Sequence, residues 1–185
     1  MRKVIEGIVD LGFLHLTELF DLSDVEVTGT FRCNNNFLTN LTGSPHTVGG
    51  SFKCSINNLT NLEGGPHTVS GAFYCDGNNL TNLVGSPKTV GGGFFCMHTS
   101  LTSLKGAPEI VNGSFHCYNN NLTNLKGAPR TVGSHFNCTN NSLTNLNGIP
   151  KTVGGHFYID KALRDKFPEE YIRSLCNIEG NIVYR

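Results

Sequence analysis

Large apolar residues recur along this chain at a fixed interval of 21 positions, with polar residues, glycine and proline between them. We call a position that recurs in every repeat a column. Leucine fills one such column and cysteine fills another. The leucines are Leu38, Leu59, Leu80, Leu101, Leu122 and Leu143, and the cysteines are Cys33, Cys54, Cys75, Cys96, Cys117 and Cys138. A period of this length without insertions is typical of a solenoid, in which each unit buries its apolar face against the next.

One unit reads L-T-x-L-x-G-x-P-x-x-V-x-G-x-F-x-C-x-x-N-x. The segment V-x-G-x-F-x-C carries its large groups at alternate positions, which predicts one strand with a single buried face. Phe52 and Cys54 are therefore expected to point inward. Parallel stacking at about 4.8 Å would place Phe over Phe and Cys over Cys.

The remaining columns predict turns and an irregular return path. Asparagine stands three residues after most of the cysteines, where its amide can bond backbone groups that a bend leaves unpaired. Glycine fills one position in six copies, from Gly43 to Gly148, which predicts a positive φ or backbone crowding. Proline follows two residues later, from Pro45 to Pro150, and argues against an α-helix in this segment.

The core F-x-C-x-x-N-x-L-x-x-L resembles the leucine-rich repeat pattern L-x-L-x-x-N-x-L-x-x-L, with Phe and Cys in the two strand positions. It most resembles the short repeats of bacterial effectors and of proteins from tailed bacteriophages, over residues 16–159. The resemblance implies a mainly β fold: a leucine-rich repeat solenoid with one parallel β-sheet, irregular return loops and a small C-terminal helical cap. It also implies a partner-binding surface and no inherited activity, because only about 26 residues follow the array.

Three regions follow from these patterns. Residues 1–37 are predicted to be an N-terminal cap with a degenerate first repeat, residues 38–159 the array, and residues 160–185 a helical cap with a final strand. Asp160 is expected to cap a helix, and Ile182–Tyr184 to add the last strand. The alternative for this helix is a surface that packs on another protein.

Charge and hydropathy restrict the function classes. Fourteen basic and fourteen acidic residues give no net charge, which provides no broad electrostatic surface for nucleic acid or an anionic membrane. No run of 18 apolar residues exists, and Glu6 and Asp10 interrupt any signal-peptide core. The expected location is the cytoplasm, or the host cytoplasm for a bacteriophage protein.

Cysteine and histidine raise the question of a metal. Six of the seven cysteines share one inward column and no C-x2-C pair occurs, so a reduced ladder in the core is expected, with neither disulfides nor a cofactor. His135 and His156 occupy one outward column on adjacent strands, about 4.8 Å apart. A metal site there is the weaker alternative, because no carboxylate is fixed beside them.

Two outward columns flank the inward cysteine, and the repeat does not need large apolar side chains in them. Mid-array, these columns nevertheless hold aromatic, methionine and charged residues. The predicted partner-binding residues are Lys53, Tyr74, Asp76, Phe95, Met97, His116 and Tyr118. Such a composition is typical of a protein-binding surface. The alternative is that β-propensity alone places Tyr and Phe on an open sheet.

No motif of a hydrolase, nucleotide-binding protein or metalloprotease is present, so an enzyme is not expected. The leading hypothesis is a non-enzymatic module that binds another protein through the concave sheet face. The resemblance suggests a bacteriophage-encoded inhibitor of a bacterial host protein, such as a defence protein. The alternatives are a self-assembling structural protein that forms homo-oligomers, and nucleic-acid binding along Arg32 and Lys53.

Overall fold

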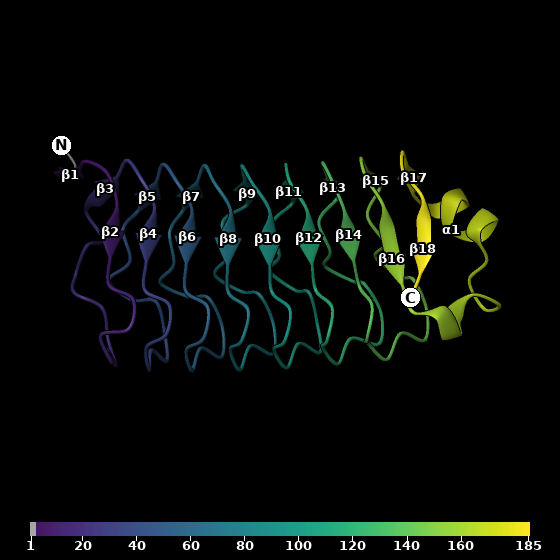
Figure 1. Ribbon diagram of the computed structural model, residues 1–185, viewed down its shortest axis with the longest axis horizontal. Coiled ribbons are helices and arrows are strands. Elements are labelled where there is room, and N and C mark those ends of the chain that lie inside the picture. Colours follow the sequence, from purple (N-terminus) through teal and green to yellow (C-terminus); the bar gives the residue numbers. More distant parts are fainter. Residues whose placement is uncertain (1–2) are drawn as a thin grey trace.

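A computed structural model describes residues 3–185 as a β-solenoid with two parallel sheets of nine strands each. Met1 and Arg2, the first residues of the predicted N-terminal cap, lie outside the described residues. The coils stack side by side in one row, and each contributes one short strand to either sheet (Figure 1). All described strand pairs are parallel and join residues of adjacent coils.

Sheet A and sheet B are named by their strands in chain order. Sheet A holds β1 (Lys3–Ile5), β3 (Val25–Val27), β5 (Thr47–Val48), β7 (Thr68–Val69), β9 (Thr89–Val90), β11 (Ile110–Val111), β13 (Thr131–Val132), β15 (Thr152–Val153) and β17 (Asn177–Ile178). Sheet B holds β2 (Val9–Asp10), β4 (Phe31–Arg32), β6 (Phe52–Lys53), β8 (Phe73–Tyr74), β10 (Phe94–Phe95), β12 (Phe115–His116), β14 (Phe136–Asn137), β16 (Phe157–Ile159) and β18 (Ile182–Tyr184).

The predicted leucine-rich repeat solenoid with a single sheet is therefore wrong. The segment expected to be one strand is two, because the chain bends at Gly49 and Gly50 between Val48 of sheet A and Phe52 of sheet B. An added Cβ at Gly49 would collide with the carbonyl of Thr28, and one at Gly50 would lie 2.7 Å from the carbonyl carbon of Gly29. Adjacent coils approach too closely at this corner for side chains.

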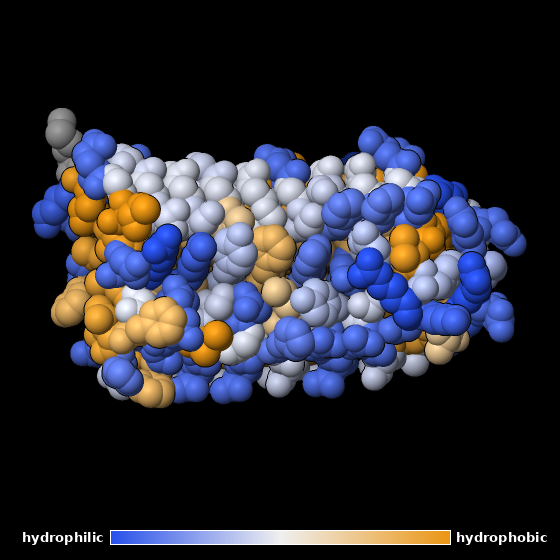
Figure 2. Space-filling model, viewed as in Figure 1, coloured by the Kyte–Doolittle hydropathy of each residue, from blue (hydrophilic) through white to orange (hydrophobic). Residues whose placement is uncertain are grey.

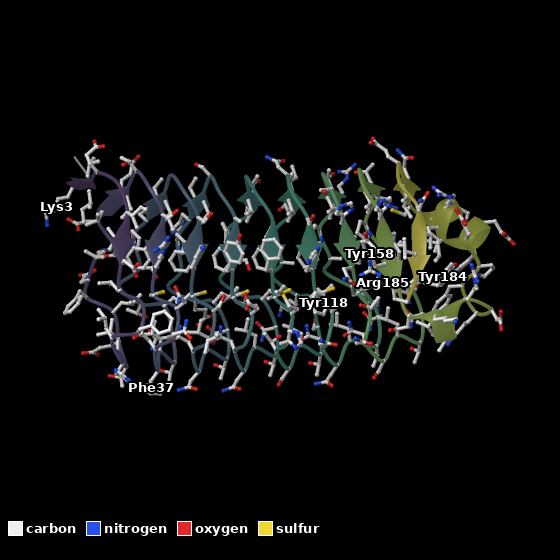
Figure 3. The ribbon with its side chains drawn as sticks, viewed as in Figure 1. Lys3, Phe37, Tyr118, Tyr158, Tyr184 and Arg185 are labelled. Atoms are coloured by element: carbon white, nitrogen blue, oxygen red, sulfur yellow. The ribbon has the colours of Figure 1, made fainter. Side chains whose placement is uncertain are left out.

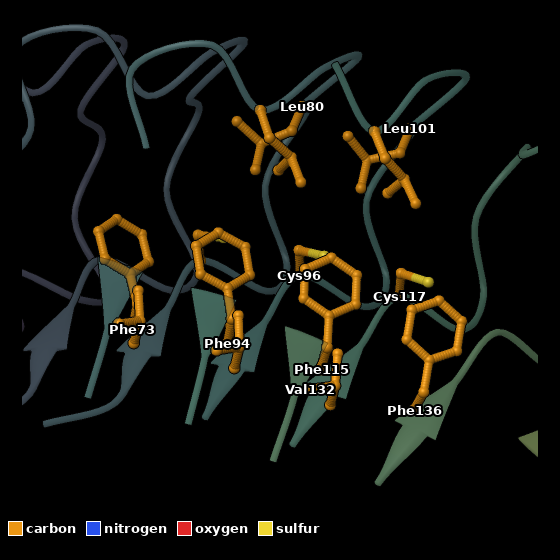
Figure 4. Close-up of a cluster of buried hydrophobic side chains, with 14 of the residues drawn as sticks. Phe73, Leu80, Phe94, Cys96, Leu101, Phe115, Cys117, Val132 and Phe136 are labelled. Atoms are coloured by element: carbon orange, nitrogen blue, oxygen red, sulfur yellow. The ribbon is translucent and has the colours of Figure 1, made fainter. Parts of the chain in front are cut away.

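The interior consists of ladders, which are rows of the same residue type in successive coils, as the inward columns predict. The valine, phenylalanine and cysteine columns and both leucine columns are buried throughout the array. Successive phenylalanine rings have centroids 5.1 to 5.6 Å apart, and they stand in one row above the strands (Figure 4). All seven cysteines are free and buried. Burial raises the pKa of the Cys75 thiol well above its usual range, so this ladder is chemically inert in the folded protein.

Asparagine side chains hold adjacent coils together at the bend after sheet B, which confirms their predicted role. Asn57 Oδ1 accepts a hydrogen bond from Leu38 N at 3.0 Å. Its Nδ2 donates to the carbonyls of Cys33 and Cys54 at 3.0 and 3.1 Å. The same arrangement recurs at Asn78 and Asn120. Each amide thus satisfies three backbone groups that no strand partner reaches.

A small cap covers the C-terminal end, as predicted. It contains the 3-10 helix η1 (Lys161–Leu163) and the helix α1 (Glu169–Leu175), whose Ile172 is fully buried. Asp160 does not cap η1 with its side chain; its carboxylate accepts a hydrogen bond from Asn140 N at 2.6 Å instead. In residues 3–185 no helix has the length and apolar character needed to cross a membrane.

Candidate surface site on the outer face of sheet B

The candidate site lies on the outer face of sheet B, where β6, β8, β10 and β12 run side by side. Their register pairs Lys53 with Tyr74, Tyr74 with Phe95, and Phe95 with His116. The second column, Asp76, Met97 and Tyr118, follows two residues later in each coil. The structure therefore brings all seven predicted residues together, and each of them is partly exposed.

Aromatic rings form the centre of this surface. Tyr74 and Phe95 stack with centroids 4.7 Å apart and planes 14° from parallel. The ring of His116 meets Phe95 edge-on, with 5.3 Å between the ring centroids and an angle of 86°. The Nζ of Lys53 lies 5.1 Å from the centroid of Tyr74 on the other side of the stack. We call Tyr74, Phe95, His116, Met97 and Tyr118 the aromatic ridge. Figure 3 shows Tyr118 near the middle of the array.

Burial at the ridge has an electrostatic consequence. Partial burial lowers the pKa of the His116 imidazole, and the nearby His135 lowers it further. Both causes disfavour the charged ring. His116 consequently contributes an uncharged ring to the ridge at neutral pH.

A groove of ≈ 510 Å³ flanks the ridge on its N-terminal side. Its charged side chains are Asp10, Arg32, Lys53 and Asp76. Arg32 Nη1 donates to Asp10 Oδ2 at 2.9 Å, and Ser55 Oγ donates to Asp76 Oδ1 at 2.6 Å. The ion pair neutralises much of the charge on Arg32 and so weakens the case for a nucleic-acid contact along Arg32 and Lys53.

Asp10 and Phe13 line this groove but are absent from the predicted set. The first coil lacks the glycine and proline signature of the array, so its register cannot be read from the 21-residue pattern. The pairing of Asp10 with Arg32 becomes visible only in the sheet.

The accessible patch ends after β12. Asn137 and Thr139 continue the two outward columns, but they hydrogen-bond to each other and are buried. Beyond them, the guanidinium of Arg185 lies 4.3 Å from the ring centroid of Tyr158, and these two side chains lie close together near the C-terminal end in Figure 3. The outward columns are thus continuous, whereas the unbroken run of aromatic side chains on β8, β10 and β12 ends at the buried Asn137.

A larger groove, ≈ 970 Å³, runs elsewhere, along the return loops. It is lined mainly by Gly, Ser, Thr and Pro of three coils, with the imidazoles of His46 and His67 stacked 4.4 Å apart. Small turn residues provide few anchors for a partner. We therefore rank this groove below the aromatic ridge.

His135 and His156 stack with ring centroids 5.0 Å apart, close to the spacing predicted for adjacent strands. The Nδ1 of His135 accepts a hydrogen bond from His156 N, and the Nδ1 of His156 accepts one from Asn181 N, both at 2.9 Å. A ring that accepts at Nδ1 carries its proton at Nε2, so these Nε2 atoms offer no lone pair to a metal. In residues 3–185, no group of three or more His, Cys, Asp or Glu side chains has the geometry for a metal ion.

These two hydrogen bonds link adjacent coils. Serine performs the same role in other coils, where Ser51 Oγ accepts from Ala72 N at 3.1 Å.

Comparisons with protein-family models, with curated proteins and with solved structures find no match to this chain, so its function has to be argued from the surface described above.

Proposed function

We propose that the protein is a non-enzymatic binding module whose aromatic ridge on sheet B contacts another protein. The observation that carries this proposal is the contiguous set of partly exposed aromatic and methionine side chains at positions where the fold needs none. Other coils place Arg32 or Asn137 in the same column. β-propensity alone would not concentrate the large apolar groups in adjacent coils.

The orientation of the rings favours a protein over a sugar or a nucleobase. Ligands that stack need an open ring face, but Phe95 covers one face of Tyr74 and the Lys53 ammonium covers the other. Both faces of the Tyr74 ring are therefore already covered. Rigid aromatic side chains on the face of a sheet suit an apolar surface of a partner protein, where they add buried area at little entropic cost.

Polar groups beside the ridge supply the rim that such interfaces require. Asp76 and Lys53 border the groove, and the Asp10–Arg32 ion pair lies at its N-terminal end. A partner with complementary charge would gain orientation and specificity from these groups, and most of the affinity from the rings. The resemblance to bacteriophage repeat proteins makes a bacterial host protein the proposed partner, and inhibition of that protein the proposed role.

The proposal is tested by capture from bacterial lysate with wild type, Phe95→Ala and Tyr118→Ala. Removal of a central aromatic side chain should weaken binding of the true partner by about 30-fold or more. The captured protein is then purified, and its dissociation constant is measured against each variant. Ile110→Ala, which truncates an exposed apolar residue on sheet A, is the matched control and should bind as the wild type does.

Two results would overturn the proposal. One is capture that neither Phe95→Ala nor Tyr118→Ala changes. The other is an equal loss of binding with Ile110→Ala, which would place the contact elsewhere or indicate nonspecific adhesion.

A further inference from the structure

The two ends of the solenoid differ in how they cover the core. At the C-terminal end, Phe167 and Ile172 of the cap are buried against the last coil. At the other end, among the described residues, no element covers β1 and β2, which are the edge strands of sheets A and B. The N-terminal end is the most continuously hydrophobic part of the surface in Figure 2, at the left.

The side chains at this end are the last layer of the core, left partly open. Ile5, Val9 and Leu11 stand in the valine, phenylalanine and cysteine columns. Their counterparts in the next coil, Val27, Phe31 and Cys33, are fully buried, whereas these three are not. We call the apolar side chains of the first coil the N-terminal end face. They are Val4, Ile5, Ile8, Val9, Leu11, Phe13, Leu14, Leu16 and Phe20.

The exposed area is close to what a stable dimer buries. Ile8, Phe13 and Phe20 are 61%, 70% and 65% exposed, and Val4 and Leu14 are each 54% exposed. With 150 to 250 Å² for an aromatic side chain, the whole end face leaves on the order of 600 Å² of apolar surface in solvent. A standard interface buries about 800 Å² per partner, and this exposed area is at the upper limit of about 600 Å² for the largest apolar patch on a typical monomer.

We propose that the N-terminal end face is the interface of a head-to-head dimer of this chain. An edge strand needs an extended partner, and a two-fold axis perpendicular to sheet A would pair β1 antiparallel with β1 of the second copy. The same contact closes both open cores at once. Because the cap blocks the C-terminal end, association stops at two copies and does not continue into a fibre.

Charge at this end predicts how the dimer responds to salt. Residues 3–26 contain six carboxylates and one lysine. Asp24 is paired with Lys3 and Asp10 with Arg32, and within residues 3–185 the carboxylates of Glu6, Glu18, Asp21 and Glu26 form no ion pair. Two such ends repel each other weakly, and salt screens the repulsion. Apolar association of this face should therefore strengthen with salt, whereas an electrostatic contact with a basic partner would weaken.

Sedimentation velocity of the full chain from about 1 to about 200 µM, in low and in high sodium chloride, tests the proposal. We expect the mass to rise with protein concentration from 20.1 kDa toward twice that value. In high salt, this rise should occur at a lower protein concentration than in low salt. Ile8→Asp should weaken the dimer at least tenfold. Ile56→Asp introduces the same group at a residue that is 55% exposed on the array and should leave the dimer intact.

Circular dichroism and thermal melting of both variants check that the fold is retained. Amide hydrogen exchange of β1 in the wild type adds a readout that needs no substitution, since protection of Lys3–Ile5 should increase with protein concentration. A wild type that stays monomeric throughout, association that Ile8→Asp does not weaken, or growth beyond two copies would each overturn the proposal. Phe13 also lines the groove beside the aromatic ridge, but the substituted residue Ile8 does not, so these outcomes leave the binding proposal for the ridge unchanged.

Discussion

Replacing Leu101 by aspartate is expected to prevent the array from folding. Leu101 is completely buried, and it lies beside Leu80 in the interior shown in Figure 4. No described side chain around it is charged, because the ladders on all sides are leucine, phenylalanine and cysteine. An unpaired carboxylate in such a site costs more than about 4 kcal/mol, which is comparable with the whole stability of a typical domain.

Far-UV circular dichroism and urea titration of Leu101→Asp measure this effect. Thr102→Asp is the matched control, because its side chain is exposed one residue away and its stability should change by less than about 0.5 kcal/mol. In a solenoid, the coils on the N-terminal side of the lesion can retain structure when the centre is broken, so partial loss of the β signal also fits. An unfolding midpoint equal to that of the wild type would contradict the burial of the leucine ladder.

Asn78→Ala is expected to cost about 3 kcal/mol or more. The Oδ1 of Asn78 accepts from Leu59 N at 3.1 Å, and its Nδ2 donates to the carbonyls of Cys54 and Cys75, both at 3.0 Å. Alanine would leave these three backbone groups buried and unpaired, and each such group costs about 1 to 3 kcal/mol. The exposed neighbour variant Asn79→Ala should be nearly neutral.

A substitution at Thr99 should have the opposite effect on stability, because this threonine stands where other coils have the asparagine equivalent to Asn78. The hydroxyl of Thr99 donates to Cys96 O and Asn120 Oδ1. In the neighbouring coils, Leu59 N donates to Asn78 Oδ1 and Leu101 N donates to Asn120 Oδ1. Thr99 offers no such acceptor to the equivalent backbone amide. Thr99→Asn should therefore stabilise the protein by about 1 kcal/mol. Urea titrations of Asn78→Ala and Thr99→Asn that shift the midpoint in the same direction would show that the asparagine ladder is not what joins the coils.

Much of the aromatic ridge can be predicted from the repeat alone. Once Phe and Cys are assigned to the interior, period-two alternation places Tyr74, Phe95 and His116 outside, and their register follows from the equal length of the units. The sequence could not show which outward residues remain accessible, because Asn137 and Thr139 are buried by contacts with each other and with neighbouring coils. It also could not show that Tyr74 and Phe95 cover each other's faces, which depends on side-chain rotamers.

The period, the inward columns, the positive φ of Gly85 and its equivalents, and the helical cap can all be predicted from the amino-acid sequence, because each is a local preference repeated in every unit or at one end. The division of the array into two sheets, in contrast, is visible only in three dimensions. Val48, Phe52 and Cys54 point inward whether the chain runs straight or bends at Gly49 and Gly50, so the alternation pattern is the same in both cases. The bend is fixed because the preceding coil comes close to Gly49 and Gly50, where its residues Thr28 and Gly29 leave no space for a side chain. This contact joins residues about 21 positions apart, so a local sequence pattern cannot predict it.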